Sequence, residues 1–244
     1  MPHRNAKRAN RPNPRIDRTP PQLPEPEHRR FRRVELIPRN IAQERYIDAL
    51  YDDSKPIVFA VGPAGSGKTL LCTEFAIKGY QEGRFKKIII TRPAVSVDEQ
   101  HGFLPGDIIQ KMHPWMMPIL DVFKKYYAVK TLHYMIANEM VEIAPLAYMR
   151  GRSLSDAIII ADEMQNSTIS QTKMVLTRIG DNSRMILTGD LQQHDRGYDM
   201  NGMKDFLDRL KRFGSSKGIA VIEFTNKDVI RHPIIEDVLR LYGE

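Results

Sequence analysis

The stretch that decides the fold reads PIVFAVGPAGSGKT and spans residues 56–69. Its first half, 56–62, is almost entirely apolar, as expected of a strand that is buried on both faces. Its second half, 62–69, fits the pattern G-x-x-x-x-G-K-[ST] and leads into a helix-like segment. A strand, a glycine-rich turn and a helix in this order predict a loop that wraps around phosphate groups.

The residues of this loop have distinct expected tasks. The glycines allow the backbone to curl, so that successive N–H groups point inward at the start of a helix. Lys68 is expected to reach the β- and γ-phosphates and Thr69 to bind Mg²⁺, which makes ATP and Mg²⁺ the expected cofactors. We assign nucleotide contacts to Gly62, Pro63, Ala64, Gly65, Ser66, Gly67, Lys68, Thr69 and Leu70.

From Val34 to Glu244 the chain alternates short β-branched runs with longer helical stretches. The expected strands are 56–62, 87–92, 156–163, 184–190 and 219–224, with a shorter candidate at 141–145. The expected helices are 41–51, 68–82, 106–127, 169–180, 201–213 and 233–242. This alternation predicts one α/β domain over 34–244, with a doubly wound, mostly parallel sheet.

The composition places the net charge in the first segment of the chain. The chain has 244 residues, 41% of them hydrophobic, and a net charge of +7. Residues 1–33 hold ten Lys or Arg and three acids, so they carry +7 and the remainder is neutral. This basic, proline-rich tail is poor in apolar side chains, and we expect it to be disordered. It is either an arm that binds nucleic-acid phosphates or a solubilising leader without a specific partner.

Two features bear on location. No apolar run is long enough to span a membrane, and the basic N-terminus lacks the apolar segment of a secretory signal. The single cysteine, Cys72, cannot form an internal disulfide, which favours a reducing compartment. We therefore expect a cytoplasmic protein.

The stretch AIIIADEMQN, residues 157–166, ends a buried strand in two adjacent acids. P-loop folds carry such an acid at the end of a strand beside the P-loop strand, where it holds Mg²⁺ directly or through water. We expect Asp162 to hold the metal and Glu163 to polarise the attacking water as general base. The competing interpretation is a solvent-exposed acidic turn after a core strand.

A third strand end, in RMILTGDLQQHD at 184–195, also passes from apolar to polar. Ligands of open α/β sheets bind beyond the carboxyl ends of the strands. An amide there can sense the γ-phosphate or orient water, and we assign this role to Gln193. Gln165 and Asn166 are expected to relay the state of the phosphate toward it. The alternative is a turn with incidental amides.

Taken together, these motifs resemble the PhoH family of P-loop ATPases. The resemblance covers about residues 36–244 and extends well beyond the phosphate loop. It rests on TRPAV (91–95), GFLPGD (102–107), EIAPLAYMRGR (142–152), DEMQN (162–166), LTRIG (176–180), LTGDLQQHD (187–195) and VIRHPII (229–235). GFLPGD followed by EIAPLAYMRGR is highly specific, because a generic P-loop ATPase is not expected to carry either stretch.

The resemblance implies a RecA-like core, similar to the N-terminal core of superfamily 1 helicases but without their second domain. It implies ATP hydrolysis coupled to the binding or remodelling of RNA or single-stranded DNA. The short single-domain form looks like the version carried by bacteriophages or as a lone bacterial protein, so the expected location is a bacterial or phage-infected host cytoplasm. Two departures bear on coupling and partner choice: His101 stands where Lys is common, and HDRGYDMNGM (194–203) replaces a proline-containing stretch.

The resemblance also extends the nucleotide site toward the residues before the P-loop. Helicase-like cores place a glutamine here that reads adenine through its amide, and this assigns Asn40 and Gln43 to the nucleotide. The ring of Tyr46 is expected to stack nearby. The alternative is a plain amphipathic helix.

Four arginines complete the expected site. Arg92 ends the second strand, where superfamily 1 cores contact nucleic acid, and Arg150 and Arg152 flank Gly151, which allows close approach to phosphates. The alternative for that pair is a surface loop with two solvated arginines. Arg231 follows a strand and is expected to stabilise γ-phosphate charge in the transition state. Because a second RecA-like domain is absent, we expect a ring of subunits, a hexamer, with ATP at the interfaces.

Two other functions compete with an ATPase that remodels nucleic acid. The first is an ATP-gated RNA-binding or scaffold protein with little turnover, which the presence of Glu163 disfavours. The second is a small-molecule kinase, which the lack of an arginine-rich lid insertion and the polar strand ends disfavour.

Overall fold

A computed structural model describes residues 32–93, 108–193, 201–214, 216–230 and 233–241. The chain divides into two units, Met1–Arg30 and Phe31–Glu244, and every described residue belongs to the second unit. The expected tail at 1–33 lies almost wholly outside the described residues, and its disorder stays a prediction. His101 and most of the departure at 194–203 lie outside them as well.

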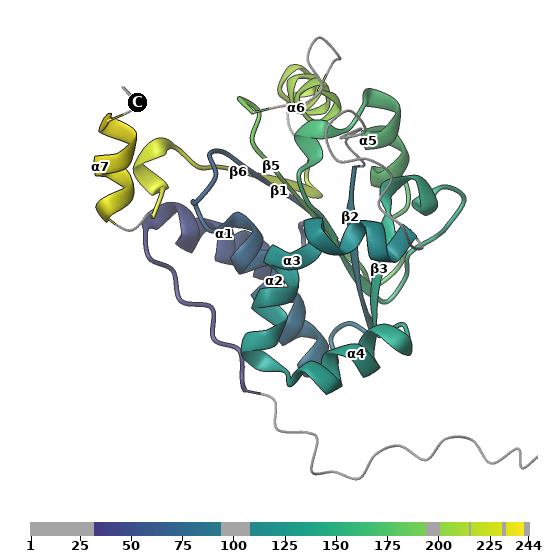
Figure 1. Ribbon diagram of the computed structural model, residues 1–244. Helices are drawn as coiled ribbons and strands as arrows, with labels where there is room; N and C mark the ends of the chain where they lie inside the picture. Colours follow the sequence, from purple (N-terminus) through teal and green to yellow (C-terminus); the bar gives the residue numbers. More distant parts are fainter. Residues whose placement is uncertain (1–31, 94–107, 194–200, 215, 231–232, 242–244) are drawn as a thin grey trace, which may run out of the picture. The chain divides into compact units, whose positions relative to one another are not determined.

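The sheet is built from six strands. They are β1 Ile57–Val61, β2 Lys87–Arg92, β3 Val141–Pro145, β4 Ala157–Ala161, β5 Arg184–Gly189 and β6 Ile219–Glu223. Their order is β3-β2-β4-β5-β1-β6, and every pairing is parallel. Figure 1 shows the sheet with helices around it. All residues of β4 are buried, as its continuous isoleucine run indicates for a strand covered on both faces. The predicted α/β sheet is confirmed, and it is parallel throughout the described strands.

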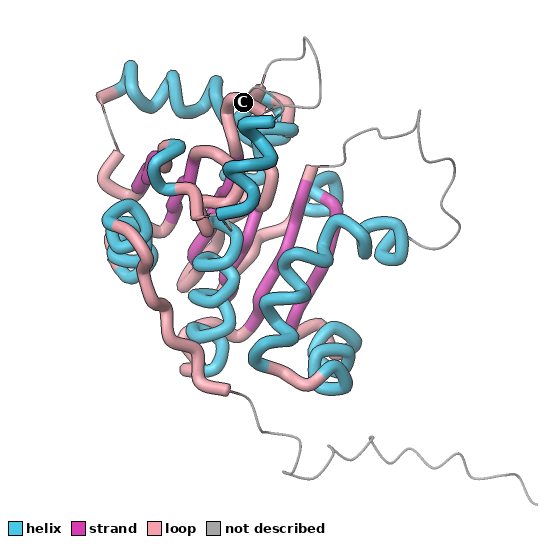
Figure 2. Tube along the Cα trace, turned by 60° about the vertical axis from the view of Figure 1, so that its left-hand side comes forward, coloured by secondary structure: helices cyan, strands magenta, loops and turns pink. Residues whose placement is uncertain are grey.

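Helices pack on both faces of this sheet (Figure 2). They are α1 Ile41–Tyr51, α2 Lys68–Gln81, α3 Ile108–Tyr126, α4 Val129–Ala137, α5 Ile169–Leu176, α6 Gly202–Phe213 and α7 Pro233–Leu241. One hydrophobic core lies between the helices α1, α2, α3 and α4 and the sheet face that carries Ile160. A second core lies between the helices α5 and α6 and the opposite sheet face, which carries Ile159. Neighbouring strand residues therefore face opposite cores, as a pleated strand requires.

One helix was missed and another was predicted too long. The helix α4 was not predicted: Ala128 gives it no side-chain cap, and only Leu132 and Met135 of its residues are buried. The helix expected over 169–180 ends at Leu176. Beyond that point Ile179 forms a parallel bridge with Leu154, and this extended pairing is incompatible with continuing the helix.

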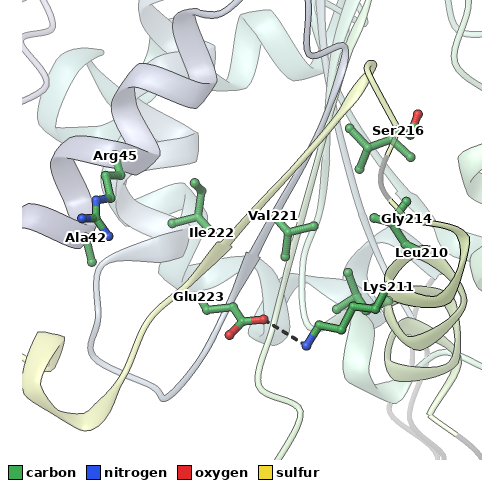
Figure 3. A pocket seen from close by; sticks show the side chains of 11 residues that line it. Ala42, Arg45, Leu210, Lys211, Gly214, Ser216, Val221, Ile222 and Glu223 are labelled. Atoms are coloured by element: carbon green, nitrogen blue, oxygen red, sulfur yellow. Dashed lines mark ion pairs between the residues drawn. The ribbon is translucent and has the colours of Figure 1, made fainter.

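The strand β6 forms one edge of the sheet, and a groove runs along it between α1 and α6 (Figure 3). Arg45 lines it from the side of α1 and Lys211 from the side of α6, where the Lys211 ammonium lies 3.3 Å from the Glu223 carboxylate. The residues that line this groove include none from the phosphate loop. No helix in the described part of the chain combines the length and the apolar character needed to cross a membrane.

Candidate nucleotide-binding site

The phosphate loop connects β1 to α2 and is tied to both neighbours of β1. The Gly62 N–H donates to the Gly189 carbonyl of β5 at 3.0 Å, and the Phe224 N–H, just after β6, donates to the Val61 carbonyl at 2.7 Å. Three loop glycines have positive φ angles, of 144°, 83° and 87° at Gly62, Gly65 and Gly67. The predicted strand, loop and helix are therefore present, and the loop adopts the curled backbone for which glycine was inferred.

The Lys68 ammonium lies inside this loop. It donates to the carbonyls of Gly62 at 2.7 Å and Pro63 at 2.8 Å, and to the hydroxyl of Ser66 at 3.2 Å. Burial lowers the pKa of Lys68 because it penalises the charged form, while the carboxylates of Asp190, Glu163 and Asp162 oppose that effect. A buried cation that holds only neutral acceptors favours the arrival of an anionic ligand.

Thr69, Asp162 and Thr188 meet beside the loop. The Thr69 hydroxyl donates to Asp162 Oδ1 at 3.0 Å, and the Thr188 hydroxyl contacts the same oxygen. Asp162 is buried and its N–H donates to the Thr91 carbonyl of β2 at 2.9 Å. Asp162 and Thr69, the two residues expected to hold the metal, are thus in direct contact.

The expectation that the strand of Asp162 lies beside the P-loop strand was wrong. The strand β5 lies between β1 and β4, so the acid reaches the loop across an intervening strand. The contact is possible because Thr188, near the end of β5, points to the same face and bridges the gap. The polar end of β5 was recognised in the sequence, but its contact with Asp162 depends on strand order.

The oxygen ligands at this point suit Mg²⁺. Magnesium is usually bound through one or two carboxylates together with substrate phosphates and water. The Thr69 hydroxyl and the Asp162 carboxylate supply such a partial set. No group of three or more His, Cys, Asp or Glu side chains that could hold a metal exists among the described residues. The residues therefore fit a metal ion that is completed by a nucleotide, and not a metal site that is complete by itself.

Glu163 follows Asp162 in a left-handed backbone conformation, with φ 54° and ψ 40°. Such angles are uncommon outside glycine and asparagine and are found at functional sites more often than elsewhere. One carboxylate oxygen accepts a hydrogen bond from the Gln165 amide, and the other lies 3.9 Å from Arg92 Nη2. The side chain is 37% exposed. Glu163 is therefore partly exposed, and both of its carboxylate oxygens face protein side chains.

Gln165 connects this acid to the end of β5. Its oxygen accepts the Asp190 N–H at 3.2 Å, and the Asp190 carbonyl accepts the Gln193 N–H at 3.2 Å. The side chain of Gln165 is buried, while that of Gln193 is exposed. A hydrogen-bonded path thus runs from Glu163 to the backbone of Gln193, and the relay of the phosphate state along it stays a prediction.

The profile of the family described as PhoH-like protein matches residues 35–243. The chain belongs to the PhoH-like protein family. The PhoH-like protein of Bacillus subtilis (strain 168) is 41% identical over 207 residues, which cover 84% of this chain and 63% of the relative. Protein PhoH of Escherichia coli (strain K12) is 38% identical over 212 residues, which cover 85% of this chain and 58% of the relative. The chain spans about three fifths of the length of these relatives.

Two solved structures are similar over part of their length. The large terminase from a thermophilic bacteriophage aligns with a TM-score of 0.45 and 12% identity, covering 82% of this chain and 50% of the terminase. The Pif1 helicase from Candida albicans aligns with a TM-score of 0.35 and 11% identity, covering 85% of this chain and 44% of the helicase. At these scores, neither likeness bears on the function of the PhoH-like chain.

Gln43 and Asn40, the residues expected to read adenine, hydrogen-bond to other parts of the protein. The Gln43 amide donates to the Ser66 carbonyl at 3.0 Å, and its oxygen accepts the Arg39 N–H at 2.9 Å. Asn40 caps α1 by accepting the Gln43 N–H at 2.9 Å, and its amide donates to the Asp228 carbonyl at 3.1 Å. Their contact with the base stays a prediction. The expectation for Tyr46 was wrong, because its ring is fully buried against Phe224 and is unable to reach a ligand.

The arginines assigned to nucleic acid have different surroundings in the PhoH-like chain. Arg92 is 21% exposed and donates to the Trp115 carbonyl at 3.1 Å. Arg150 is exposed and lines a groove along α5, together with Lys173. Arg152 forms a two-point ion pair with Glu142 of β3. This pairing was missed because it joins residues of opposite charge across a turn that shows no spacing signal. All three assignments stay predictions.

Arg231 lies outside the described residues. Its neighbour Ile230 is described, and the Ile230 N–H donates to the Gly65 carbonyl at 3.0 Å. The residue just before Arg231 is therefore hydrogen-bonded to the phosphate loop of its own subunit. A catalytic part for Arg231 stays a prediction.

Proposed function

We propose that this PhoH-like chain binds ATP with Mg²⁺ and hydrolyses the bond between its β- and γ-phosphates. The observation that carries the proposal is the meeting of Thr69 and Asp162 at 3.0 Å, beside a loop that surrounds the Lys68 ammonium. This arrangement supplies a cation for the phosphates and oxygen ligands for the metal in one place. We assign the proton acceptor to Glu163, the residue that follows Asp162.

The residues divide the reaction among them. The loop N–H groups and Lys68 bind the phosphates, and Lys68 exchanges its carbonyl partners for phosphate oxygens. Thr69 and Asp162 would hold Mg²⁺, which would supply positive charge to the phosphates of the nucleotide. Glu163 accepts the proton of the attacking water, and Gln193 orients that water or senses the γ-phosphate. Arg231 adds a positive charge against the leaving phosphates.

The second part of the proposal is that hydrolysis is coupled to RNA or single-stranded DNA. Support comes from two arginines. Arg92 lies 3.9 Å from Glu163, and Arg150 lines a groove with Lys173 to which the described residues contribute no acidic side chain. Such a basic groove suits a phosphate backbone. This proposal includes helicase-like movement along a nucleic-acid strand. It also includes binding of nucleic-acid phosphates by the basic tail at 1–33.

One observation favours the alternative of an ATP-gated binding or scaffold protein with little turnover. Both carboxylate oxygens of Glu163 face side chains of the protein, Gln165 and Arg92. A base whose two oxygens both face protein side chains is not free to contact the attacking water until it is released. Slow turnover in the absence of a partner is therefore expected under either candidate, and the two differ in what nucleic acid does to the rate.

We place the protein in the cytoplasm, where ATP is plentiful and where its buried free cysteine, Cys72, stays reduced. We also propose a ring of subunits, with Arg231 acting on the ATP of its own or of the neighbouring subunit. The bond between Ile230 and the phosphate loop supports action within one subunit. A hexamer remains the proposed size.

The proposal is tested by measuring phosphate release from ATP, with and without single-stranded RNA, for the wild type and for Glu163→Gln. Loss of the base is expected to lower kcat by about 10²- to 10⁴-fold while ATP binding is retained. The control is Glu82→Gln, which alters an exposed glutamate at the far end of α2 and is expected to leave the rate unchanged.

Each other outcome has a definite meaning. A rate that Glu163→Gln leaves unchanged would contradict the assigned base. A rate that RNA and single-stranded DNA do not alter would favour the scaffold. Transfer of the phosphate to a small molecule in place of water would show a kinase.

A further inference from the structure

Arg92 stands at the junction of three elements of the described fold. It is the last residue of β2, and β2 pairs with β4, which leads directly into Glu163. One guanidinium nitrogen donates to the Trp115 carbonyl of α3 at 3.1 Å, and another lies 3.9 Å from the Glu163 carboxylate. A single side chain thus links the proposed base to a helix on the face of the sheet that carries α2.

The two contacts of Glu163 differ in strength. Gln165 is buried, and its oxygen is fixed by the Asp190 N–H, so its amide is a stationary donor. Arg92 lies beyond hydrogen-bond distance, and both partners of this ion pair are partly exposed, at 21% and 37%. An ion pair of this kind contributes little to the stability of the fold, because water competes for both charges. The Arg92 contact is therefore the one that a ligand can exchange at small cost.

A phosphate group is a better partner for this guanidinium than the carboxylate at its present distance. Arginine binds phosphate oxygens through two parallel N–H donors, and that geometry is absent from the contact with Glu163. The side chain of Arg92 is 21% exposed, so it is partly accessible to a ligand. A strand that passes the carboxyl ends of β2 and β4 would present a phosphate to it.

We propose that Arg92 restrains Glu163 and that a phosphate of a bound nucleic-acid strand releases it, so that strand binding switches on hydrolysis. This inference rests on the proposed ATPase function and deepens it by naming the residue that couples the two ligands. When the strand takes Arg92, Glu163 keeps only the Gln165 donor and turns toward the water. Arg92 is a positioning residue, because it acts on the reaction through Glu163.

The test compares the wild type with Arg92→Gln and Arg92→Lys, and measures kcat and KM for ATP with and without polyuridylate. Arg92→Gln is expected to raise kcat without RNA by about two- to five-fold, because an exposed ion pair is worth no more than that factor. It is also expected to abolish stimulation by polyuridylate and to leave KM for ATP unchanged. Arg92→Lys keeps the charge without the fork and is expected to retain part of the stimulation.

Two measurements address the strand itself. An uncharged morpholino strand of the same bases is expected to give no stimulation, because it offers no phosphate to Arg92. Fluorescence anisotropy of a labelled RNA is expected to show weaker binding by Arg92→Gln, with the slope of log K against log salt reduced by about one. The matched control is Arg209→Gln, which removes a surface arginine that is ion-paired with Asp205 on α6 and is expected to change none of these quantities.

The outcomes separate this inference from the function on which it rests. If RNA stimulates the wild type and Arg92→Gln equally, or if Arg92→Gln lowers kcat without RNA, the coupling by Arg92 is wrong while the ATPase stands. If the wild type releases no phosphate under any condition, the proposed function and this inference both fail. Retention of stimulation by the morpholino strand would overturn the phosphate as the releasing group.

Discussion

At the scale of single residues, the phosphate loop depends on two glycines that make room for other segments. A Cβ at Gly62 would lie 2.3 Å from the Phe224 carbonyl oxygen, and a Cβ at Gly67 would lie 2.7 Å from the Gln43 amide nitrogen. Both contacts come from distant parts of the sequence. The glycines thus allow the loop to curl and also allow β6 and α1 to approach it.

Replacing Gly62 tests the second of these tasks. Gly62→Ala adds both a strained φ of 144° and a clash with Phe224, whereas Gly83→Ala adds strain at a φ of 72° where nothing lies within 4 Å. We expect Gly83→Ala to lower the free energy of unfolding by about 1 kcal/mol. Gly62→Ala is expected to cost about 1–3 kcal/mol more and to abolish ATP binding. Urea unfolding checks the first expectation, and equal costs for the two variants would contradict the clash.

The residues of the candidate site were predictable from the sequence where they belong to a motif with a known chemical task. Lys68, Thr69 and Asp162 were assigned from their spacing and from the strand that precedes each motif, and the structure places them together. The contacts of Glu163 with Arg92 and Gln165 were not predictable, because they depend on side-chain directions at two strand ends. Sequence patterns report local structure, and these contacts are tertiary.

At the scale of elements, the outer strand β3 is fastened to its neighbours by a charged group. Glu142 is 18% exposed and contacts Lys87 of β2 at 2.8 Å and Arg152 through two nitrogens. Hydrogen bonding to Arg152, and then to Lys87, lowers the pKa of Glu142 from 4.5 to about 2 despite the opposing effect of burial. The charged carboxylate therefore favours the folded state.

Stability is expected to depend on pH through this group. Because the pKa is lowered in the folded state, the contribution is complete above about pH 4.5 and is lost as the pH falls toward 2. Glu142→Gln is expected to remove about 2 kcal/mol from the difference in unfolding free energy between about pH 6 and pH 3. Urea unfolding at both values checks this, with the exposed Glu44→Gln as control. An unchanged pH dependence would show that the ion pair contributes nothing.

Elements differed in how far the sequence predicted them. The mostly apolar, β-branched runs predicted five of the strands, and β3 was predicted only as a shorter candidate. The helix α4 was missed because it lacks a capping side chain. The position of β5 between β1 and β4 was also missed, because the order of parallel strands is set by packing between elements and leaves no local pattern.

At the scale of the whole molecule, α7 presents an apolar surface that a ring of subunits would cover. Val238 is 43% exposed and Leu241 is 86% exposed, both on the last helix of the described chain. We expect light scattering in the presence of ATP and Mg²⁺ to give about six times the mass of one chain. Leu241→Lys is expected to lower that mass, since it places a charge in a covered surface. A monomeric mass for the wild type would count against the ring.

The order of the strands also governs how the protein emerges from the ribosome. The strand β1 is the first to be synthesised, yet its neighbours in the sheet are β5, at Arg184–Gly189, and β6, at Ile219–Glu223. A strand whose neighbours in the sheet come so late in the sequence has only long-range strand pairings, and such pairings form slowly. The phosphate loop begins at Gly62, but the hydrogen bonds from Gly62 to Gly189 and from Phe224 to Val61 form only after Gly189 and Phe224 have been made. Until then the nascent chain carries an unpaired apolar strand, which makes it a natural client for chaperones.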